Sequence, residues 1–369
     1  MTSKAFGLAQ LGNVFDDGAL SNRNILINGK FEVNQYNDGS STSFAAGAYF
    51  VADRFDYYTN AGAFAVYSAT HEISSDAPDG FSKSLKITCT SGGTIPSTGE
   101  VVFRQKIEGY NSSVLNYGSA NGESATVSFW IKASVTGDYG LQFVYYDGTN
   151  SQFYVSKYTV NSANTWEYKT VTIPPQTTNA FDNVTNGNGL TVYWDLGEGS
   201  TYSGTAGAGW GTTYLNGLSG GVKLMENTGA TWQITGVQLE VGDTATPFEH
   251  RSYGDELARC QRYFLMCKPE TSAGITHAGF ANLNARSTTA RYSVVHFPVS
   301  MRVRPSVAYS GSLTAYSGSG SYAVSAISMN GSTEHAAEME ITAASGATVG
   351  HGGWVRILAD AYVEFDSEL

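Results

Sequence analysis

Apolar and polar residues alternate with a period of two along most of the chain from Asn24 onward. Segments such as ATVSFWIKAS and QFYVSKYTV mix β-branched and aromatic residues, and clusters of Gly, Asn, Asp and Ser separate them. This pattern is typical of strands joined by turns, because successive side chains of a strand point to opposite faces. About ten such segments follow one another without intervening helices, which predicts an antiparallel jelly-roll sandwich over residues 24–250.

A second group of strand-like segments lies in residues 269–369. It includes GITHAGFANL, ARYSVVHFPV and GGWVRILADAYVEFD, again separated by small polar residues. We expect these segments to form a second unit, a C-terminal β-sandwich tip. The fold class predicted for the whole chain is therefore all-β.

One helical signal separates the two β units, in residues 251–268. Ser252 is a suitable N-cap, and acidic residues follow it in the first turn, where negative charge is favoured. An apolar stripe at helical spacing comprises Leu257, Cys260 and Phe264. A helix this short is marginal alone, so we expect the stripe to pack against a neighbouring domain or against other copies on a trimer axis.

The amino-acid composition reduces the number of functions that are compatible with the chain. The net charge is −11, only 14% of the 369 residues are charged, and no basic run occurs, so nucleic acid is a poor candidate partner. Gly (42 residues) and Tyr (23 residues) are abundant, which suits an adaptable recognition surface. The N-terminus lacks the apolar core of a signal peptide, so we expect synthesis in the cytoplasm without classical export.

Residues 1–23 differ from the rest of the chain. They contain too few apolar residues to offset the entropy of ordering them, yet KAFGLAQLGNVF is too apolar for a pure spacer. We expect these residues to become ordered by docking onto another protein.

Several segments together resemble tail-fibre and related virion structural proteins of tailed bacteriophages. They include SKAFGLAQLGNVFDDGALSNRNILINGKFEVNQ, VSFWIKASVTGDYGLQF, the terminal AYVEFDSEL and, as the most specific, WQITGVQLEVGDTATPFEHRSYGDELARCQRYF. The central part also resembles the jelly roll of carbohydrate-binding modules. The resemblance implies a homotrimeric tail appendage of the virion that has no enzymatic activity and no cofactor. It also implies that residues 1–23 attach to other tail or virion proteins, and that the C-terminal tip meets a host surface polysaccharide or outer-membrane component.

A structural calcium ion is a feature of many such carbohydrate-binding jelly rolls. The resemblance places one of its ligands at Glu32, which follows the Asn-Gly-Lys-Phe stretch, and expects an acidic residue on the final strand. Thr235 and Gly236 stand there instead. One carboxylate is a weak site for a cation that prefers six to eight oxygen ligands, so the sequence does not favour a metal.

Aromatic residues near turns are the best candidates for ligand contact. Flat rings present apolar faces to sugar C–H groups, and Tyr and Trp also donate hydrogen bonds. The candidates are Tyr145, Tyr146, Trp194, Tyr202, Trp210 and Tyr214 in the first β unit, and Tyr316 and Tyr322 in the C-terminal unit. Trp130 and Trp166 lie inside alternating strands and are expected in the core.

Two alternatives to a receptor-binding fibre stay open. A decoration or adaptor protein of the same fold would only bridge other virion proteins. A polysaccharide depolymerase would need catalytic groups, and Asp195 with Glu198 could form the carboxylate pair of a glycosidase. The sequence favours solvated turn carboxylates at these two positions, and it shows no long β-helix repeat. We therefore expect no catalytic residues.

Overall fold

The computed structural model describes residues 22–36, 41–44, 46–146, 151–178, 185–270, 274–318 and 320–369. The chain divides into two compact units, one ending at Tyr253 and the other spanning Gly254–Glu368. Both are built from strands, so the predicted all-β class is confirmed. The attachment segment expected over residues 1–23 lies, apart from its last two residues, outside the described part of the chain.

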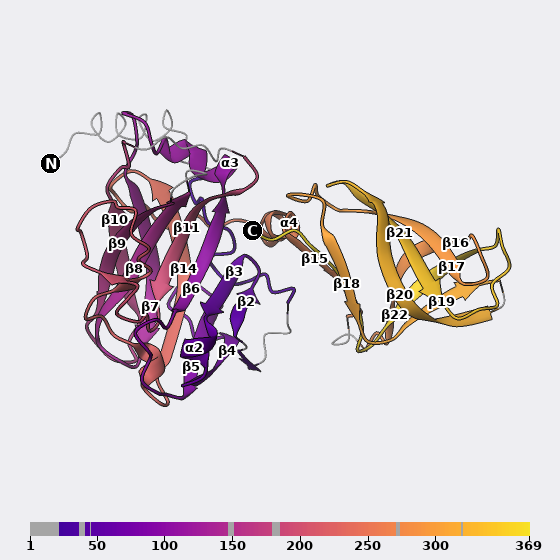
Figure 1. Ribbon diagram of the computed structural model, residues 1–369, viewed down its shortest axis with the longest axis horizontal. Coiled ribbons are helices and arrows are strands. Elements are labelled where there is room, and N and C mark those ends of the chain that lie inside the picture. The colour runs from indigo at the N-terminus through magenta and orange to yellow at the C-terminus, as the bar shows by residue number, and fades with distance from the viewer. Residues whose placement is uncertain are drawn as a thin grey trace. The chain divides into compact units, whose positions relative to one another are not determined.

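The first unit is a sandwich of two six-stranded antiparallel sheets (Figure 1), which confirms the predicted jelly-roll sandwich. Sheet A has the order β1 (Thr42–Ser43), β4 (Ser68–Ser74), β5 (Ser84–Ser91), β14 (Thr231–Val241), β7 (Ala125–Ala133) and β10 (Glu167–Ile173). Sheet B has the order β2 (Gly47–Ala52), β3 (Phe55–Thr59), β6 (Val101–Glu108), β11 (Asn188–Asp195), β8 (Gly137–Tyr146) and β9 (Ser151–Val160).

Short elements connect these strands. They are α2 (Ala61–Phe64), α3 (Gly109–Ser112), the 3-10 turns η1 (Ser113–Leu115) and η2 (Leu224–Glu226), and the two-residue strands β12 (Ser203–Gly204) and β13 (Gly217–Leu218).

Large aromatic side chains fill the space between sheets A and B. Phe55 and Phe103 stack with ring centroids 5.1 Å apart, and Trp232 donates from Nε1 to the Tyr158 hydroxyl at 3.0 Å. These side chains come from the inward-facing positions of the period-two pattern. Since aromatic residues bury 150–250 Å² each, roughly, they supply much of the driving force for packing the sheets together.

The segment predicted as a first strand, ILINGKFEV, is irregular in the structure, although most of its residues are buried. It follows the second half of β14, where the Ile25 amide donates to the Leu239 carbonyl at 2.8 Å and the Val237 amide donates to the Gly29 carbonyl at 3.0 Å. The Asn24 side chain donates to the Val237 carbonyl and accepts from the Leu239 amide, each at 3.0 Å. The segment thus satisfies backbone groups of β14 without becoming a regular strand, as buried peptide groups require.

Glu249 and Arg251 fasten the same segment from the other side. The Glu249 carboxylate accepts from the amides of Asn22 and Asn24 at 2.6 and 2.8 Å, and also pairs with Arg251 at 3.2 Å. The Arg251 guanidinium, whose side chain is 4% exposed, donates to the carbonyls of Asn24 and Leu26. The Pro-Phe-Glu-His-Arg stretch therefore ties the end of the sandwich to its beginning.

The second unit contains a closed barrel with the order β16 (His277–Ala285), β17 (Ala290–His296), β21 (Ala336–Ala343), β20 (Gly320–Ser332), β19 (Leu313–Ser317) and β22 (Gly352–Leu358). A three-stranded sheet adds β15 (Phe264–Cys267), β23 (Tyr362–Asp366) and β18 (Ser306–Ser310). The expectation of a C-terminal sandwich was therefore wrong. The alternation fixes which residues face inward, but it does not distinguish a closed sheet from two stacked ones.

The connecting helix is shorter than predicted. Helix α4 spans Tyr253–Gln261, and β15 begins at Phe264 because the chain pairs there with β23. The predicted helical stripe of Leu257, Cys260 and Phe264 is therefore wrong for Phe264, which lies outside the helix. Cys260 and Phe264 are already buried within the single chain and Leu257 is half-buried, so the first two are unavailable as a trimer contact. No helix among the described residues is long and apolar enough to span a membrane.

Replacing Arg251 by Ala should destabilise the first unit by about 3 kcal/mol, because the substitution leaves the largely buried Glu249 carboxylate and the carbonyls of Asn24 and Leu26 with fewer partners. Chemical unfolding followed by tryptophan fluorescence would measure this loss. Lys157→Ala is the matched control, because Lys157 pairs with Asp138 at 2.6 Å while its side chain is 50% exposed. The control should cost less than about 1 kcal/mol. Equal losses in the two variants would contradict the fastening role of Arg251.

Candidate functional site

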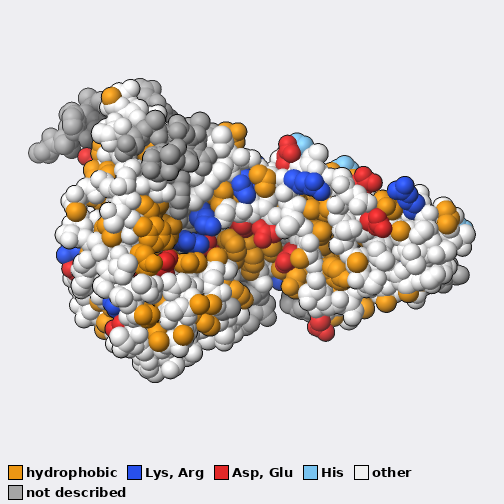
Figure 2. Space-filling model, viewed as in Figure 1, with side chains coloured by type: hydrophobic (Ala, Val, Ile, Leu, Met, Phe, Trp, Pro, Cys, Tyr) orange, Lys and Arg blue, Asp and Glu red, His pale blue; other side chains and the backbone are white. Residues whose placement is uncertain are grey.

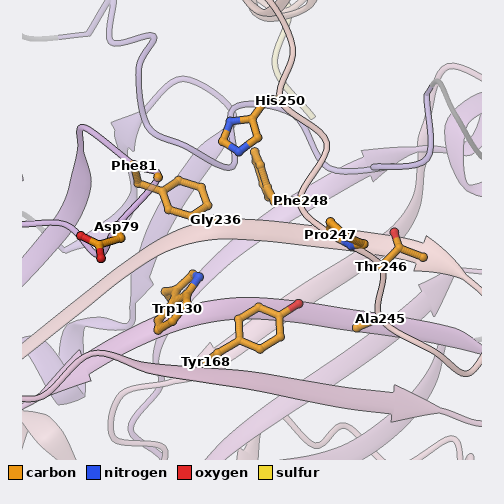
Figure 3. A pocket seen from close by; sticks show the side chains of 11 residues that line it. Asp79, Phe81, Trp130, Tyr168, Gly236, Ala245, Thr246, Pro247, Phe248 and His250 are labelled. Atoms are coloured by element: carbon orange, nitrogen blue, oxygen red, sulfur yellow. The ribbon is translucent and has the colours of Figure 1, made fainter.

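The outer face of sheet A contains a pocket with a volume of about 450 Å³. This value falls within the range of small-molecule sites, roughly 300–1,000 Å³. The pocket is lined by Asp79, Gly80, Phe81, Trp130, Tyr168, Gly236, Ala245, Thr246, Pro247, Phe248 and His250. Figure 3 shows the aromatic side chains in two groups on either side of β14 at Gly236.

The first aromatic group comes from neighbouring strands. Trp130 on β7 and Tyr168 on β10 are direct cross-strand partners, and their ring centroids lie 5.4 Å apart. Both side chains point away from the core, and Tyr168 is 44% exposed. A cross-strand aromatic pair is held by the pleat of the sheet itself, so this wall of the pocket is rigid.

The second aromatic group comes from two loops. Phe81 lies in the turn between β4 and β5, and Phe248 and His250 follow β14. The three rings contact one another, with centroid distances of 5.2 Å for Phe81 and Phe248, 5.5 Å for Phe81 and His250, and 5.0 Å for Phe248 and His250. Phe248 and His250 line the pocket because Glu249 and Arg251, which alternate with them, turn to the N-terminal segment.

Gly236 forms the floor between the two groups. It lies in a β-bulge, because the pairing of β14 with β7 shifts register between Thr235 and Gln238. Its φ of +62° favours glycine, and a Cβ there would approach Phe81 Cζ to 2.7 Å and Trp130 Cδ1 to 3.2 Å. Any larger residue would therefore push the two walls apart. Gly236, where the resemblance to carbohydrate-binding jelly rolls predicts an acidic calcium ligand, is here the base of an aromatic pocket.

Polar groups stand at the edge of this pocket. His250 is exposed, and desolvation together with the neighbouring Lys30 ammonium lowers the pKa of its imidazole, so the ring is neutral at physiological pH. The Thr246 hydroxyl donates to Glu240 at 2.6 Å, which fixes its position. Asp79 provides an exposed carboxylate. The pocket thus offers apolar ring faces with a few hydrogen-bonding groups around them.

Trp194, a predicted ligand residue, lies in the core with 0% exposure, in contact with Phe103 and Phe129. Tyr145 is equally buried, and the side chain of Tyr146 lies outside the described part of the chain. Trp130 and Trp166 are half-buried on the surface rather than in the core, which reverses the expectation for both. Alternation shows which residues share a face of a strand, but it does not tell which face is covered.

Tyr202 and Tyr214 contact each other with ring centroids 5.3 Å apart in the long loop after β11. Tyr214 is 43% exposed and donates to the Glu100 carboxylate at 3.0 Å. Trp210, from the same loop, is held away from this pair. Its indole donates to the Pro174 carbonyl at 3.0 Å, and its ring packs against Tyr154 at 5.4 Å. Trp210 therefore fastens the loop. The structure does not unite Trp194, Tyr202, Trp210 and Tyr214 in one site.

In the second unit the two predicted tyrosines face opposite sides of the barrel wall. Tyr316 points outward and stacks on Trp354, with ring centroids 5.4 Å apart and an interplanar angle of 11°. Tyr322 is the cross-strand partner of the buried Ala315, and its hydroxyl donates to the Gly346 carbonyl at 2.9 Å. A ligand on the outer face of the barrel therefore contacts Tyr316 but not Tyr322.

Asp195 and Glu198 are buried, with 3% and 1% exposure, so the expectation of solvated turn carboxylates was wrong. Asp195 accepts from the amides of Gly197, Glu198 and Leu218, each at 2.8 Å. Desolvation nevertheless raises its pKa to about 6. Desolvation and the adjacent Asp195 charge raise the pKa of Glu198 well above its usual value. The two carboxylates support the loop from within the protein, where no substrate reaches them.

Glu32 is engaged by a cation of the protein itself. Its carboxylate pairs with the Lys30 ammonium at 2.8 Å. Within the described ranges, no three His, Cys, Asp or Glu side chains are arranged to hold a metal ion. The cysteines Cys89, Cys260 and Cys267 are free thiols.

Sequence reasoning missed the main residues of the pocket, namely Phe81, Trp130, Tyr168, Phe248 and His250. The sequence contains one signal for them. In Pro-Phe-Glu-His-Arg, Phe248 and His250 alternate with Glu249 and Arg251, which predicts that the two rings lie on one side and the two charged side chains on the other. Trp354 was also missed. In GGWVRIL the buried Val355 and Ile357 alternate with Trp354 and Arg356, which must then face outward.

No protein-family model matches the chain, and no curated protein matches it. Solved structures resemble it at low identity. A CBM4 structure shares 18% identity over 58% of this chain and 97% of its own, with a TM-score of 0.29. The enzymatically active domain of tailspike protein 4 from bacteriophage CBA120 shares 13% identity over 59% and 21%, with a TM-score of 0.30. The family 11 carbohydrate-binding module of Clostridium thermocellum Lic26A-Cel5E shares 13% identity over 56% and 100%, with a TM-score of 0.28. None of these similarities assigns a function or a ligand to this chain.

Replacing Glu198 by Gln should stabilise the protein at high pH. Because the folded state binds the Glu198 proton more tightly than the unfolded state, the wild-type free energy of unfolding falls as the pH rises above about 4.5. It falls by about 1.4 kcal/mol for each pH unit until the raised pKa of Glu198 is reached. The Gln side chain keeps an oxygen for the Val101 amide, which donates to Glu198 at 2.9 Å. We expect the variant to melt several degrees above the wild type at pH 8 and to match it at pH 4.

Thermal unfolding followed by circular dichroism at pH 4 to 8 measures this difference. Glu123→Gln is the control, because Glu123 is exposed and should give the same profile as the wild type. A Glu198→Gln effect of equal size at pH 4 and pH 8 would refute the linkage to ionisation.

Proposed function

We propose that the first unit binds a glycan in the pocket of sheet A. The observation that supports this most is the arrangement of two aromatic walls over the Gly236 floor. Trp130 and Tyr168 offer ring faces on one side, and Phe81, Phe248 and His250 offer a second set on the other. Sugar rings are recognised in this way, because their C–H faces pack on aromatic rings while their hydroxyls bond to polar groups around them.

The form of the pocket favours a saccharide over an apolar ligand. It is open to solvent, whereas the sites of small apolar ligands bury most of the ligand surface. Its rim carries His250, Thr246 and Asp79, which bond to hydroxyl groups. Figure 2 shows that lysine and arginine side chains are scattered over the visible face, so this face carries no continuous basic patch of the kind that binds nucleic acid.

We further propose that the chain is a virion structural protein of a tailed bacteriophage, a tail fibre or related appendage that recognises the host surface. The resemblance of its N-terminal, Pro-Phe-Glu-His-Arg and C-terminal segments to such proteins supports this proposal. According to this proposal, residues 1–23 attach the chain to the particle and three copies assemble around one axis. The protein acts by binding and has no catalytic role.

Replacing Trp130 or Tyr168 by Ala should weaken glycan binding at least tenfold, because each side chain supplies a ring face of the pocket. A glycan array that includes polysaccharides of candidate hosts would first identify a ligand, and titration calorimetry would then compare the variants. Tyr110→Ala is the matched control, because Tyr110 is 60% exposed on α3 and lines no part of the pocket. Unchanged binding in folded Trp130→Ala protein would exclude the pocket as the site.

The purified protein should have three times the mass of one chain in solution. Since Cys260 and Phe264 are buried within the single chain, the trimer contact must use other surfaces. Light scattering combined with gel filtration would measure the mass at micromolar concentration. A stable monomer there would contradict the trimeric fibre.

Deleting residues 1–21 should leave both units folded and prevent incorporation into particles. The Asn22 amide donates to Glu249, so the deletion keeps the described contacts of the sandwich. Complementation of a phage that lacks the gene, followed by protein analysis of purified particles, would test attachment. Normal incorporation of the shortened chain would contradict the assignment.

A further inference from the structure

The outer wall of the C-terminal barrel carries an aromatic and cationic surface formed by Tyr316, Trp354 and Arg356, here called the Trp354 platform. Tyr316 on β19 and Trp354 on β22 are direct cross-strand partners with nearly parallel rings. The Arg356 guanidinium carbon lies 4.8 Å from the centroid of the Tyr316 ring. Trp354 is 44% exposed, so much of its indole surface is open to solvent.

The backbone brings these side chains together. A Cβ at Gly353 would lie only 1.8 Å from the Tyr316 carbonyl oxygen, so β22 and β19 approach each other this closely only with glycine at that position. On β22, Val355 and Ile357 are fully buried in the barrel, which fixes Trp354 and Arg356 on its outside. The two outward side chains start about 7 Å apart, the rise of two strand residues. The platform is therefore part of the rigid barrel wall.

Arg356 has no carboxylate or carbonyl acceptor among the described residues, where its one recorded contact is the Tyr316 ring. Arg291 in the same barrel is different. It is fully buried, and its guanidinium donates to the Thr289 and Ala344 carbonyls while lying over the Tyr322 ring. The donors of Arg291 serve the fold, whereas those of Arg356 are available for a ligand.

The neighbours of the platform are neutral. Across the sheet, Asn282 and Ser321 continue the row of Trp354 and Tyr316, and Thr314 is the partner of Arg356. No acidic residue occupies these positions, although the chain as a whole has a net charge of −11. A local positive charge on an exposed ring surface, bordered by amide and hydroxyl groups, is complementary to an anionic polar ligand.

We propose that the Trp354 platform binds a saccharide whose residues carry carboxylate groups. One sugar ring packs on the exposed face of Trp354. Arg356 donates two parallel hydrogen bonds to the carboxylate, which arginine does with a geometry that lysine lacks. Asn282 and Ser321 bond to hydroxyl groups of the same or the next residue. The site is separate from the pocket of sheet A and does not depend on a ligand there.

The stacking of Arg356 on Tyr316 recurs elsewhere in the second unit and bears on the bias in cation type along the chain. All lysines precede residue 269, and the positive charges beyond it are arginines. Three of these, Arg286, Arg291 and Arg356, lie over tyrosine rings at 4.7 to 4.9 Å. A planar guanidinium stacks on such rings better than an ammonium does.

The test uses the full chain and two acidic probes, trigalacturonate and 3′-sialyllactose. Their neutral counterparts are methyl-esterified trigalacturonate and lactose. Calorimetry or ligand-observed NMR should show binding of at least one acidic probe, at least tenfold tighter than its neutral counterpart and weakened by added salt. Arg356→Gln and Trp354→Ala should each reduce that binding at least tenfold, and Arg356→Lys should give an intermediate loss. Both side chains are on the surface, so thermal unfolding should confirm that the variants fold.

Several results would overturn the proposal. They are no binding of either acidic probe at millimolar concentration, equal binding of acidic and neutral forms, or wild-type binding by Arg356→Gln. A change in oligomeric mass in Trp354→Ala would show instead that the platform is a contact between copies. Trp130→Ala should bind the acidic probe normally. If Trp130→Ala alone abolishes that binding, the pocket of sheet A is the site, and the proposed function survives while the platform does not.

Discussion

The pairing of strand β14 is the constraint on which the rest of the first unit depends. Its residues Thr231–Ile234 pair with β5, but beyond Gly236 that edge has no regular strand beside it. Buried peptide groups must find partners, and the irregular segment from Asn24 to Gly29 supplies them. The change of partner coincides with the bulge at Gly236, and the bulge opens the floor of the aromatic pocket. The pocket is thus a consequence of how the sheet satisfies its hydrogen bonds.

One short stretch serves both the fold and the pocket. In residues 247–251 the side chains alternate, so that Glu249 and Arg251 bind the N-terminal segment while Phe248 and His250 complete the second wall of the pocket. A substitution of Glu249 or Arg251 would therefore also move Phe248 and His250, because the four residues share one short piece of backbone. A stretch that looks in the sequence like a linker between two β units therefore holds the N-terminal segment and forms one wall of the pocket.

The main sheet of the second unit is closed into a barrel, so its strands pair with one another all the way round. A closed barrel leaves no unpaired edge, so its outer wall is free to carry exposed rings without offering an edge for strand addition. The stacking of Tyr316 on Trp354 depends on Gly353, which lets the two strands approach closely. In both units a glycine at a close approach places the aromatic groups, at Gly236 and at Gly353.

The sequence by itself determined the all-β class, the two β units and the inward faces of most strands, because period-two alternation is a local property of the chain. It did not determine that the C-terminal unit closes into a barrel, since closure depends on strand tilt and register across the whole sheet. It also misplaced Trp194 and Trp130. Both lie in alternating strands, and only the packing of the second sheet decides which face is covered, so Trp194 became core and Trp130 a wall of the pocket. The pocket joins residues from Phe81 to His250, and only the tertiary structure brings positions so distant in sequence to one surface.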